Sequence, residues 1–287
     1  MTYILQPYDD LLEYVLEHGK EKQDRTGIGT LSVFGTQTRY DISEYFPLLT
    51  RRKVWPKAIF AELLWMISGS TNIKDLQNLG SHIWDQWQSE EFEQKNNFVP
   101  GSLGPVYGFQ LRHFGGLYWQ GEKEDFTYGY GGVDQLQQVV DLLRSDPDSR
   151  RNLFSLWNPK DLYRQKLPVC HYSFQVYVDD GKLSGMLTQR SCDLAIGCPA
   201  NIQCYSTLLY MLAQQTGYQP GEFIHSIGSA HCYLNQLEGV QEYVCREVVS
   251  SPKLELKPAK TINDYAMDNF NVIGYNPLGK ISIPVAV

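Results

Sequence analysis

Apolar residues along this chain follow a helical spacing in some segments and a strand-like alternation in others. Residues 7 to 18 place Leu11, Leu12, Val15 and Leu16 on one face of a helix. Residues 59 to 67 are almost wholly apolar and predict a buried helix. Further helices are predicted at about 133 to 143, 202 to 215 and from about 235.

Alternating apolar and polar residues predict strands, and one pair of them forms a hairpin. Between the runs 170 to 178 and 182 to 191 lies Asp179-Asp180-Gly181, which is typical turn chemistry. The segment from 88 to 105 is polar and predicts an irregular loop. The other strands are expected at about 31 to 40, 152 to 157 and 222 to 227.

The order of these elements shows hairpins with interspersed helices and no regular βα repeat. That pattern predicts an α+β protein with one dominant sheet. The 287 residues contain no internal repeat and no Ser/Gly linker, so we expect residues 1–287 to form a single domain.

The predicted hairpin bears on the chemistry, because Cys170 and Arg190 both lie at its open end. We expect the two side chains to be close together. A guanidinium beside a thiol favours the thiolate, which is the nucleophilic form. Cys170 is therefore the best candidate for covalent catalysis.

Net charge limits the class of ligand. A charge of −7 argues against a nucleic-acid polymer such as DNA, which needs a basic face, but it permits a small phosphorylated ligand bound by a local arginine cluster. No apolar run approaches the ~18 residues of a membrane span, so we expect a cytoplasmic protein. The six cysteines and six histidines have no metal-ligand spacing, and no metal site is expected.

Arginines next to turns and strand ends are candidates for binding a phosphate dianion: Arg25, Arg150, Arg151 and Arg190. For Arg150-Arg151 alone, a solvated turn is the simpler interpretation. Arg190 is different, since it lies within a strand pattern, where an unpaired charge is costly.

Three further positions have both a functional and a purely structural interpretation. Glu62 lies in an apolar helix, where burial would raise its pKa and suit it to proton transfer, or it occupies a narrow polar stripe. Asn201 either caps the following helix or presents a donor and an acceptor to the edge of a uracil ring. His231 and Tyr233 alternate along a strand and suit sugar recognition or a core pair.

The order of motifs along nearly the whole chain resembles the thymidylate synthase family. The resemblance implies one large twisted mixed sheet flanked by helices, a single catalytic domain, and a homodimer formed through the sheet. It implies reductive methylation of dUMP to dTMP with 5,10-methylenetetrahydrofolate. The matching segments include Arg25 to Gly35, Glu62-Leu-Leu-Trp65, Ile83-Trp84-Asp85, Leu103 to Gly108, Arg150-Arg151, Cys170-His171, Gln189 to Asp193, Pro199-Ala-Asn201, His231 to Tyr233 and Pro284 to Val287.

Roles follow from the resemblance residue by residue. Cys170 would attack C6 of the pyrimidine, and Glu62, Tyr107 and His171 would run the proton transfers. Arg190, Ser191 and Arg25 would hold the phosphate, with Arg150 and Arg151 reaching over from the partner subunit. The base and sugar would be bound by Gln189, Asn201, His231 and Tyr233, and the folate by Trp84, Asp193, Gly197, Arg52 and Val287, with Lys53 near its glutamate tail.

Three positions depart from the family pattern: Val169 in Pro-Val-Cys-His, Ala200 in Pro-Ala-Asn, and Ser229 in Gly-Ser-Ala-His. Ala200 replaces an aromatic residue expected along the folate, which could admit water. The alternative function is therefore a dUMP hydroxymethylase, in which water replaces the hydride. A non-catalytic relative kept for binding is disfavoured, because the catalytic set is complete and the chain is acidic.

Overall fold

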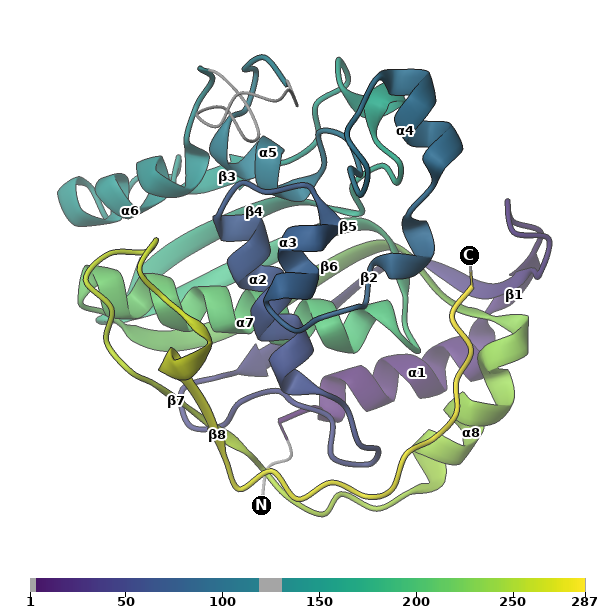
Figure 1. Cartoon of the computed structure of the whole chain (residues 1–287). Coiled ribbons are helices and arrows are strands. Elements are labelled where there is room, and N and C mark those ends of the chain that lie inside the picture. Colours follow the sequence, from purple (N-terminus) through teal and green to yellow (C-terminus); the bar gives the residue numbers. More distant parts are fainter. Residues whose placement is uncertain (1–3, 119–130, 287) are drawn as a thin grey trace.

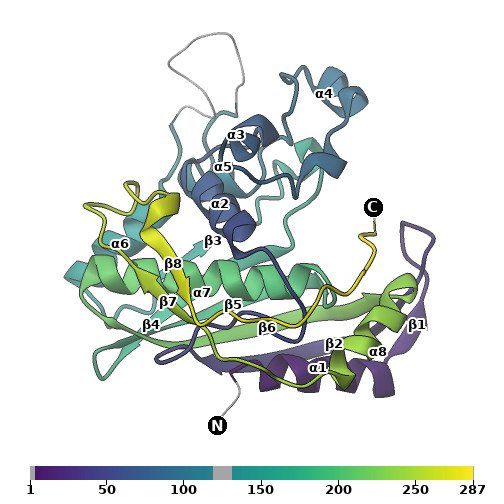
Figure 2. The same cartoon turned by 60° about the horizontal axis from the view of Figure 1, so that its bottom comes forward.

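A six-stranded mixed sheet forms the base of the molecule (Figures 1 and 2). The computed structural model describes residues 4–118 and 131–286. The strand order is β1-β2-β6-β5-β4-β3, with β5 and β6 parallel and the other neighbours antiparallel. The strands are β1 (Lys20–Lys22), β2 (Thr30–Asp41), β3 (Leu153–Ser155), β4 (His171–Asp179), β5 (Lys182–Asp193) and β6 (Gln219–Tyr233). The α+β class and the dominant sheet predicted from the sequence are confirmed.

The predicted hairpin is present as β4 and β5. Asp179 pairs with Lys182, and the two residues between them, Asp180 and Gly181, have φ angles of 46° and 71°. Two positive φ angles match the twist of the flanking strands, which is why Asp-Gly is favoured there. The turn thereby fixes the register that brings Cys170 beside Arg190.

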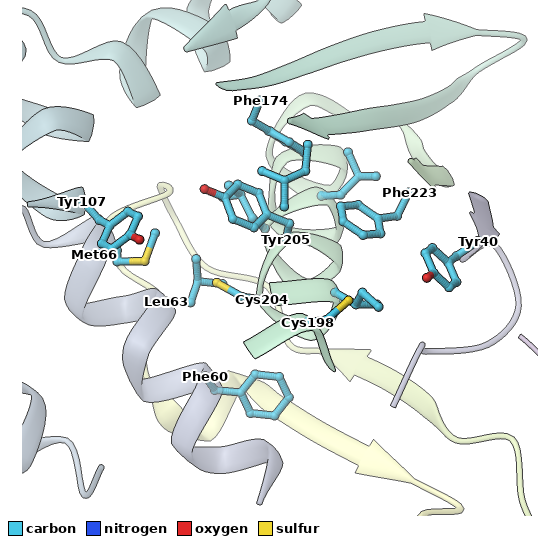
Figure 3. Packing of buried hydrophobic residues seen from close by; sticks show 14 of the residues in the cluster. Tyr40, Phe60, Leu63, Met66, Tyr107, Phe174, Cys198, Cys204, Tyr205 and Phe223 are labelled. Atoms are coloured by element: carbon cyan, nitrogen blue, oxygen red, sulfur yellow. The ribbon is translucent and has the colours of Figure 1, made fainter. Parts of the chain in front are cut away.

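Helix α7 (Gly197–Thr216) covers one face of the sheet, and α2 (Pro56–Ile67) lies on the far side of α7. Figure 3 shows Leu63 and Met66 of α2 on one side of α7, with Phe174 and Phe223 of the strands on the other. A helix enclosed on both sides is apolar around most of its surface, as α7 is. This layered core holds the first turns of α7 in position, and the site residues Gly197 and Asn201 lie in those turns.

The remaining elements surround these layers. Helix α1 packs on β2, and a two-stranded antiparallel sheet lies near the C-terminal end of the chain. From this small sheet the chain continues as an irregular tail past α8 (Figure 1). The bounds are α1 (Gln6–His18), α3 (Ile73–Asn78), α4 (Glu90–Asn96), α5 (Tyr107–Arg112), α6 (Gln135–Ser145), α8 (Leu237–Cys245), β7 (Lys253–Leu256) and β8 (Phe270–Ile273).

Three sequence predictions about elements were wrong. The segment 88 to 105 is not wholly irregular, because it contains α4, which is capped by the Ser89 side chain and ends at Asn97 with φ 53°. Its serine cap and acidic first turn are helix-start signals. Strand β6 runs well beyond the predicted 222 to 227, and α7 begins at Gly197 rather than at 202.

The face of the sheet opposite α7 is less well covered. Met186 and Ile224, which pair across β5 and β6, are only half-buried, although their neighbours along each strand are buried. Tyr177 of β4, which alternates with the buried Val176, is 66% exposed. No helix in the described ranges is long and apolar enough to cross a membrane.

Gly104, three residues before Tyr107, lies against the backbone of Arg164, and this close approach requires a glycine. Its φ is +76°, and a Cβ there would collide with the backbone carbonyl oxygen of Arg164. Gly115 has the same φ with open space around it.

We expect Gly115→Ala to lower the free energy of unfolding by about 1 kcal/mol through backbone strain alone. Gly104→Ala should cost at least about 3 kcal/mol, measured by urea denaturation, and equal losses would contradict the close approach.

Candidate active site

A cavity of about 900 Å³ opens beside the first turn of α7. Its wall combines residues of α2, α5, the ends of β5 and β6, and the C-terminal tail. Most of the residues selected from the sequence line it: Arg25, Arg52, Lys53, Glu62, Trp84, Tyr107, Cys170, His171, Gln189, Arg190, Ser191, Asp193, Gly197, Asn201, His231 and Tyr233. Arg150 and Arg151 are exposed and do not line the cavity, and Val287 lies outside the described residues.

Cys170 lies immediately before β4, with its side chain half-buried at the cavity wall. Its backbone N–H donates to the Tyr107 hydroxyl over 2.9 Å, and its carbonyl accepts from the Arg190 N–H, also over 2.9 Å. The backbone on both sides of the thiol is therefore held by neighbouring elements. The thiol lines the cavity, and its Sγ lies 3.9 Å from the Pro168 carbonyl oxygen.

Arg190 is fixed beside Cys170 by the chain that precedes the cysteine. Its Nε donates to the Val169 carbonyl over 2.8 Å and an Nη to the Pro168 carbonyl over 2.7 Å. The guanidinium also lies over the Trp157 ring, 5.6 Å from the ring centroid. The two carbonyl oxygens and the Trp157 ring thus give the Arg190 guanidinium hydrogen-bond and cation–π partners. Without them the charge on this strand residue would be partly buried and unpaired.

The expected bias of Cys170 towards thiolate is wrong for the thiol as the structure places it. Burial raises the pKa of Cys170, while Arg190 and the Tyr107 hydroxyl lower it by less. The proximity to Arg190 predicted from the hairpin is confirmed. Partial desolvation of the sulfur at the cavity wall nevertheless outweighs the favourable charge.

Glu62 of α2 is half-buried at the cavity wall, and its carboxyl receives a hydrogen bond of 2.6 Å from the Trp84 indole N–H. Burial raises its pKa from the ordinary 4.5 to about 7, against the smaller lowering effect of Trp84. Of the two interpretations that the sequence left open, the raised pKa favours an enclosed carboxyl over an exposed polar stripe. A carboxyl with a pKa near 7 exchanges protons in both directions at neutral pH.

His171 stacks on the Tyr107 ring, with centroids 4.0 Å apart and planes at 12°. Its Nδ1 lies 2.7 Å from the Tyr205 hydroxyl. Burial, followed by the charge of His225, lowers the pKa of His171 to about 3. The imidazole is neutral at physiological pH, so it supports the Tyr107 ring and does not supply a proton as a cation.

Asn201 lies in the second turn of α7, four residues after the helix begins at Gly197. The helix-capping interpretation of this residue is therefore wrong. Its Oδ1 accepts a hydrogen bond of 3.0 Å from the Gln189 Nε2. Because both side chains line the cavity, an amide edge is presented to any ligand bound there.

His231 and Tyr233 share one face at the end of β6, with ring centroids 5.3 Å apart. Burial lowers the pKa of His231, so the ring is neutral near pH 7. Asp193 pairs with His231 in the sheet register and accepts hydrogen bonds from the Ala195 and Ile196 backbone N–H groups. Two neutral hydrogen-bonding rings and a fixed carboxylate thus face the cavity from adjacent strands.

Aromatic and basic side chains line the mouth. The Trp84 and Trp87 rings are 5.0 Å apart, and the Lys53 ammonium lies 4.6 Å from the centroid of the Trp55 ring, which is 69% exposed. Arg52 is buried and donates to the Ala195 carbonyl. Flat apolar walls with a cationic rim fit a ligand that has aromatic rings at one end and carboxylates at the other.

The C-terminal tail closes one side of the cavity. Gln236 donates from its Nε2 to Asp193 over 3.0 Å and to the Pro284 carbonyl over 3.1 Å. One buried amide thereby connects the tail to the carboxylate of the site. Ile281, Ile283 and Ala286 add apolar lining.

Sequence reasoning missed several residues of the site, among them Trp55, Trp87, Gln236 and His225. His225 does not line the cavity but contacts Gln189 behind it. A signal was present, because His225 lies between Phe223 and Ile227 in the buried phase of a strand. A polar residue in that phase needs a buried partner.

The sequence model for thymidylate synthase matches residues 6–287. This chain belongs to the thymidylate synthase family. The human thymidylate synthase is 46% identical over 280 residues, which cover 96% of this chain and 88% of the human protein. Membership of this family makes the chain a methyltransferase, and it confirms the resemblance inferred from the motifs.

Two more relatives show the same near-complete coverage of this chain. Thymidylate synthase of varicella-zoster virus is 43% identical across 99% of this chain and 93% of its own length. The bifunctional dihydrofolate reductase-thymidylate synthase of Zea mays is also 43% identical, across 98% of this chain. The match covers 54% of the maize protein.

Ionisation of the enclosed Glu62 should appear in the pH dependence of stability. In the unfolded chain this carboxyl loses its proton near pH 4.5, but the folded protein retains it up to about pH 7. Stability contributed by the neutral form is thus lost as pH rises through this window, by about 3 kcal/mol at most. We expect Glu62→Gln to gain that amount relative to the parent between pH 4.5 and pH 8, measured by urea unfolding.

The matched control is Glu44→Gln, which removes an exposed carboxyl. It separates the effect of burial from the general effect of one negative charge fewer. A pH-independent difference between Glu62→Gln and the parent protein would show that the Glu62 carboxyl is not enclosed.

Proposed function

We propose that this enzyme, as a single catalytic domain, converts dUMP to dTMP by reductive methylation with 5,10-methylenetetrahydrofolate. The observation that carries the proposal is the convergence of Cys170, Arg190, Glu62 and Asn201 on one cavity from four separate elements. A nucleophile, a cation, a proton carrier and an amide edge are what addition to a uracil nucleotide requires.

Cys170 is proposed to add to C6 of the pyrimidine. A bond forms between Sγ and C6, and the electron pair of the C5=C6 double bond moves to C5 and O4 as an enolate. The raised pKa of Cys170 means that the thiol is protonated beforehand and gives its proton to solvent in the cavity as the Sγ–C6 bond forms. The fixed guanidinium of Arg190 stabilises the thiolate and, together with Arg25 and Ser191, binds the phosphate.

Glu62 is proposed to move the protons. With a pKa of about 7 it donates a proton as the enolate or a leaving nitrogen becomes basic, and it accepts one when C5 loses its hydrogen. Tyr107 contacts the backbone N–H of the nucleophile, and His171 holds the Tyr107 ring from behind. Asn201 and Gln189 bind the uracil edge, and His231 and Tyr233 the deoxyribose hydroxyl.

The remaining wall of the cavity fits a folate. Trp84 and Trp87 supply flat apolar surfaces, and Asp193 accepts hydrogen bonds from a ring. The buried Arg52 and the neighbouring Lys53 supply positive charge near the glutamate tail. When bound there, the folate supplies the one-carbon unit and the hydride. Gly197 and the tail up to Val287 are proposed to enclose it.

A homodimer formed through the open face of the sheet is proposed to complete the site. Arg190 follows the same strand alternation as Met186 and Thr188, which lie on the face that α7 leaves uncovered. A second subunit on this face would be adjacent to the phosphate site. Arg150 and Arg151, which are exposed and do not line the cavity of their own subunit, are the candidates to reach over.

The product formed from dUMP tests the proposed chemistry. Incubation with methylenetetrahydrofolate should give a nucleotide heavier by one methylene group, with dihydrofolate appearing in equal amount. Cys170→Ser should lower turnover by at least about 10⁴-fold, because the hydroxyl is a far weaker nucleophile. Mass spectrometry and dihydrofolate absorbance measure both quantities.

Cys204→Val, a buried cysteine on α7, is the control for loss of a thiol and should keep normal turnover. An added oxygen in the product, without dihydrofolate, would establish the hydroxymethylase instead. Near-normal turnover by Cys170→Ser would end the covalent proposal.

Complementation between two inactive subunits tests the shared site. Arg151→Glu disables the arginine given to the partner, and Cys170→Ser disables the nucleophile of its own site. In a heterodimer of the two variants, one site should contain an intact Cys170 and an intact arginine from the partner subunit. We expect up to about a quarter of normal activity after random mixing of the subunits, and no activity in verified heterodimers would contradict a shared site.

A further inference from the structure

Four side chains form a hydrogen-bonded series behind the cavity, between α7 and the sheet. Cys198 Sγ lies 3.9 Å from His225 Nδ1, and His225 Nε2 lies 2.9 Å from Gln189 Oε1. Gln189 Nε2 in turn donates to Asn201 Oδ1 over 3.0 Å. Cys198 and His225 are fully buried and do not line the cavity, whereas Gln189 and Asn201 do.

The backbone carbonyl of Ser191 fixes the direction of this series. It lies 3.0 Å from the same Gln189 amide nitrogen, and a carbonyl can only accept. Gln189 must therefore direct Nε2 to Ser191 and Asn201 and direct Oε1 to His225. The atom of Asn201 that faces Gln189 must then be its acceptor, Oδ1.

His225 must donate from Nε2, because Gln189 Oε1 cannot. A neutral imidazole with its proton on Nε2 accepts at Nδ1, where the Cys198 thiol is placed. Burial raises the pKa of Cys198, but Cys192 and His225 together lower it to about 6. Whether the shared proton lies on sulfur or on Nδ1, His225 Nε2 remains a donor.

We propose that Cys198 and His225 are positioning residues that hold the Asn201 amide in the orientation that selects uracil over cytosine. The inference rests on the proposed function, in which Asn201 binds the pyrimidine edge. It adds the physical reason why this amide does not simply rotate to fit either base.

Uracil presents an acceptor at O4 and a donor at N3, whereas cytosine presents a donor at N4 and an acceptor at N3. An asparagine matches uracil in one orientation and cytosine after its amide has turned by 180°. In the turned orientation the Asn201 amide nitrogen would face the Gln189 amide nitrogen, two donors without an acceptor. A mismatch of that kind in a buried network is costly, so the series disfavours the cytosine orientation.

A purely packing role does not explain these residue types. His225 lies between the buried Phe223 and Ile227 and beside Leu187 of β5, where an apolar side chain would fill the layer. Figure 3 shows Cys198 on the side of α7 that faces Phe223, while Cys204 lies on the side of Leu63. The two buried cysteines of one helix therefore form a matched pair for experiment.

The test compares the dissociation constants of dUMP and dCMP by calorimetry, together with kcat and KM on dUMP. His225→Leu removes the donor to Gln189, and we expect the preference for dUMP to fall roughly tenfold, chiefly through KM. His225→Gln keeps an amide donor at the position of Nε2 and should recover most of the preference. Cys198→Val should lower it about threefold, while Cys204→Val should leave it unchanged.

Spectroscopy tests the same proposal without a substitution. The ¹⁵N shifts of His225 in the parent protein should report a proton on Nε2, and a ring with its only proton on Nδ1 would overturn the proposal. This measurement also decides the matter should His225→Leu fail to fold, as judged by its melting temperature.

Asn201→Asp separates failure of this inference from failure of the proposed function. If Asn201→Asp shifts binding towards dCMP while folded His225 and Cys198 variants keep the parent preference, edge reading stands and the positioning role is overturned. If Asn201→Asp leaves the preference unchanged, Asn201 does not read the base, and the proposed function fails at that step.

Discussion

The antiparallel pairing of β4 with β5 places Cys170 and Arg190 side by side, and the rest of the site is arranged around that pair. The tight Asp180-Gly181 turn sets the register at the far end of the hairpin. Carbonyl groups of the two residues before Cys170 then hold the guanidinium. A register slip of one residue would reverse the face of every side chain on β5 and separate the thiol from its cation.

Desolvation dominates the electrostatics of the enclosed part of this cavity. Burial raises the pKa of Cys170 and of Glu62 and lowers the pKa of His171, which favours the neutral form of each group. The fixed positive charge of Arg190 opposes this effect at Cys170 without reversing it. A thiolate in such a place is reactive when it forms, because little water surrounds it.

The sequence was sufficient where a local rule decided the structure, as at the Asp-Gly hairpin and at Glu62 within an apolar helix. It was insufficient where opposing effects had to be compared. The guanidinium beside Cys170 was visible in the sequence, but the desolvation of the sulfur, which outweighs it, depends on the tertiary structure. His225 was passed over because its partner Gln189 lies on another strand, and α4 because its cap signals stood in a polar segment.

Ala200 places a small side chain at the cavity wall where the family pattern has an aromatic ring. The aromatic ring expected there would have come from α7, but α2 begins close by, since Gln203 of α7 donates to the Pro56 carbonyl over 2.8 Å. Trp55, the residue before Pro56, lines the same cavity as Ala200. Trp55 therefore adds aromatic surface to the same cavity from the residue before α2, but its indole is 69% exposed and does not by itself close the wall beside Ala200 against water.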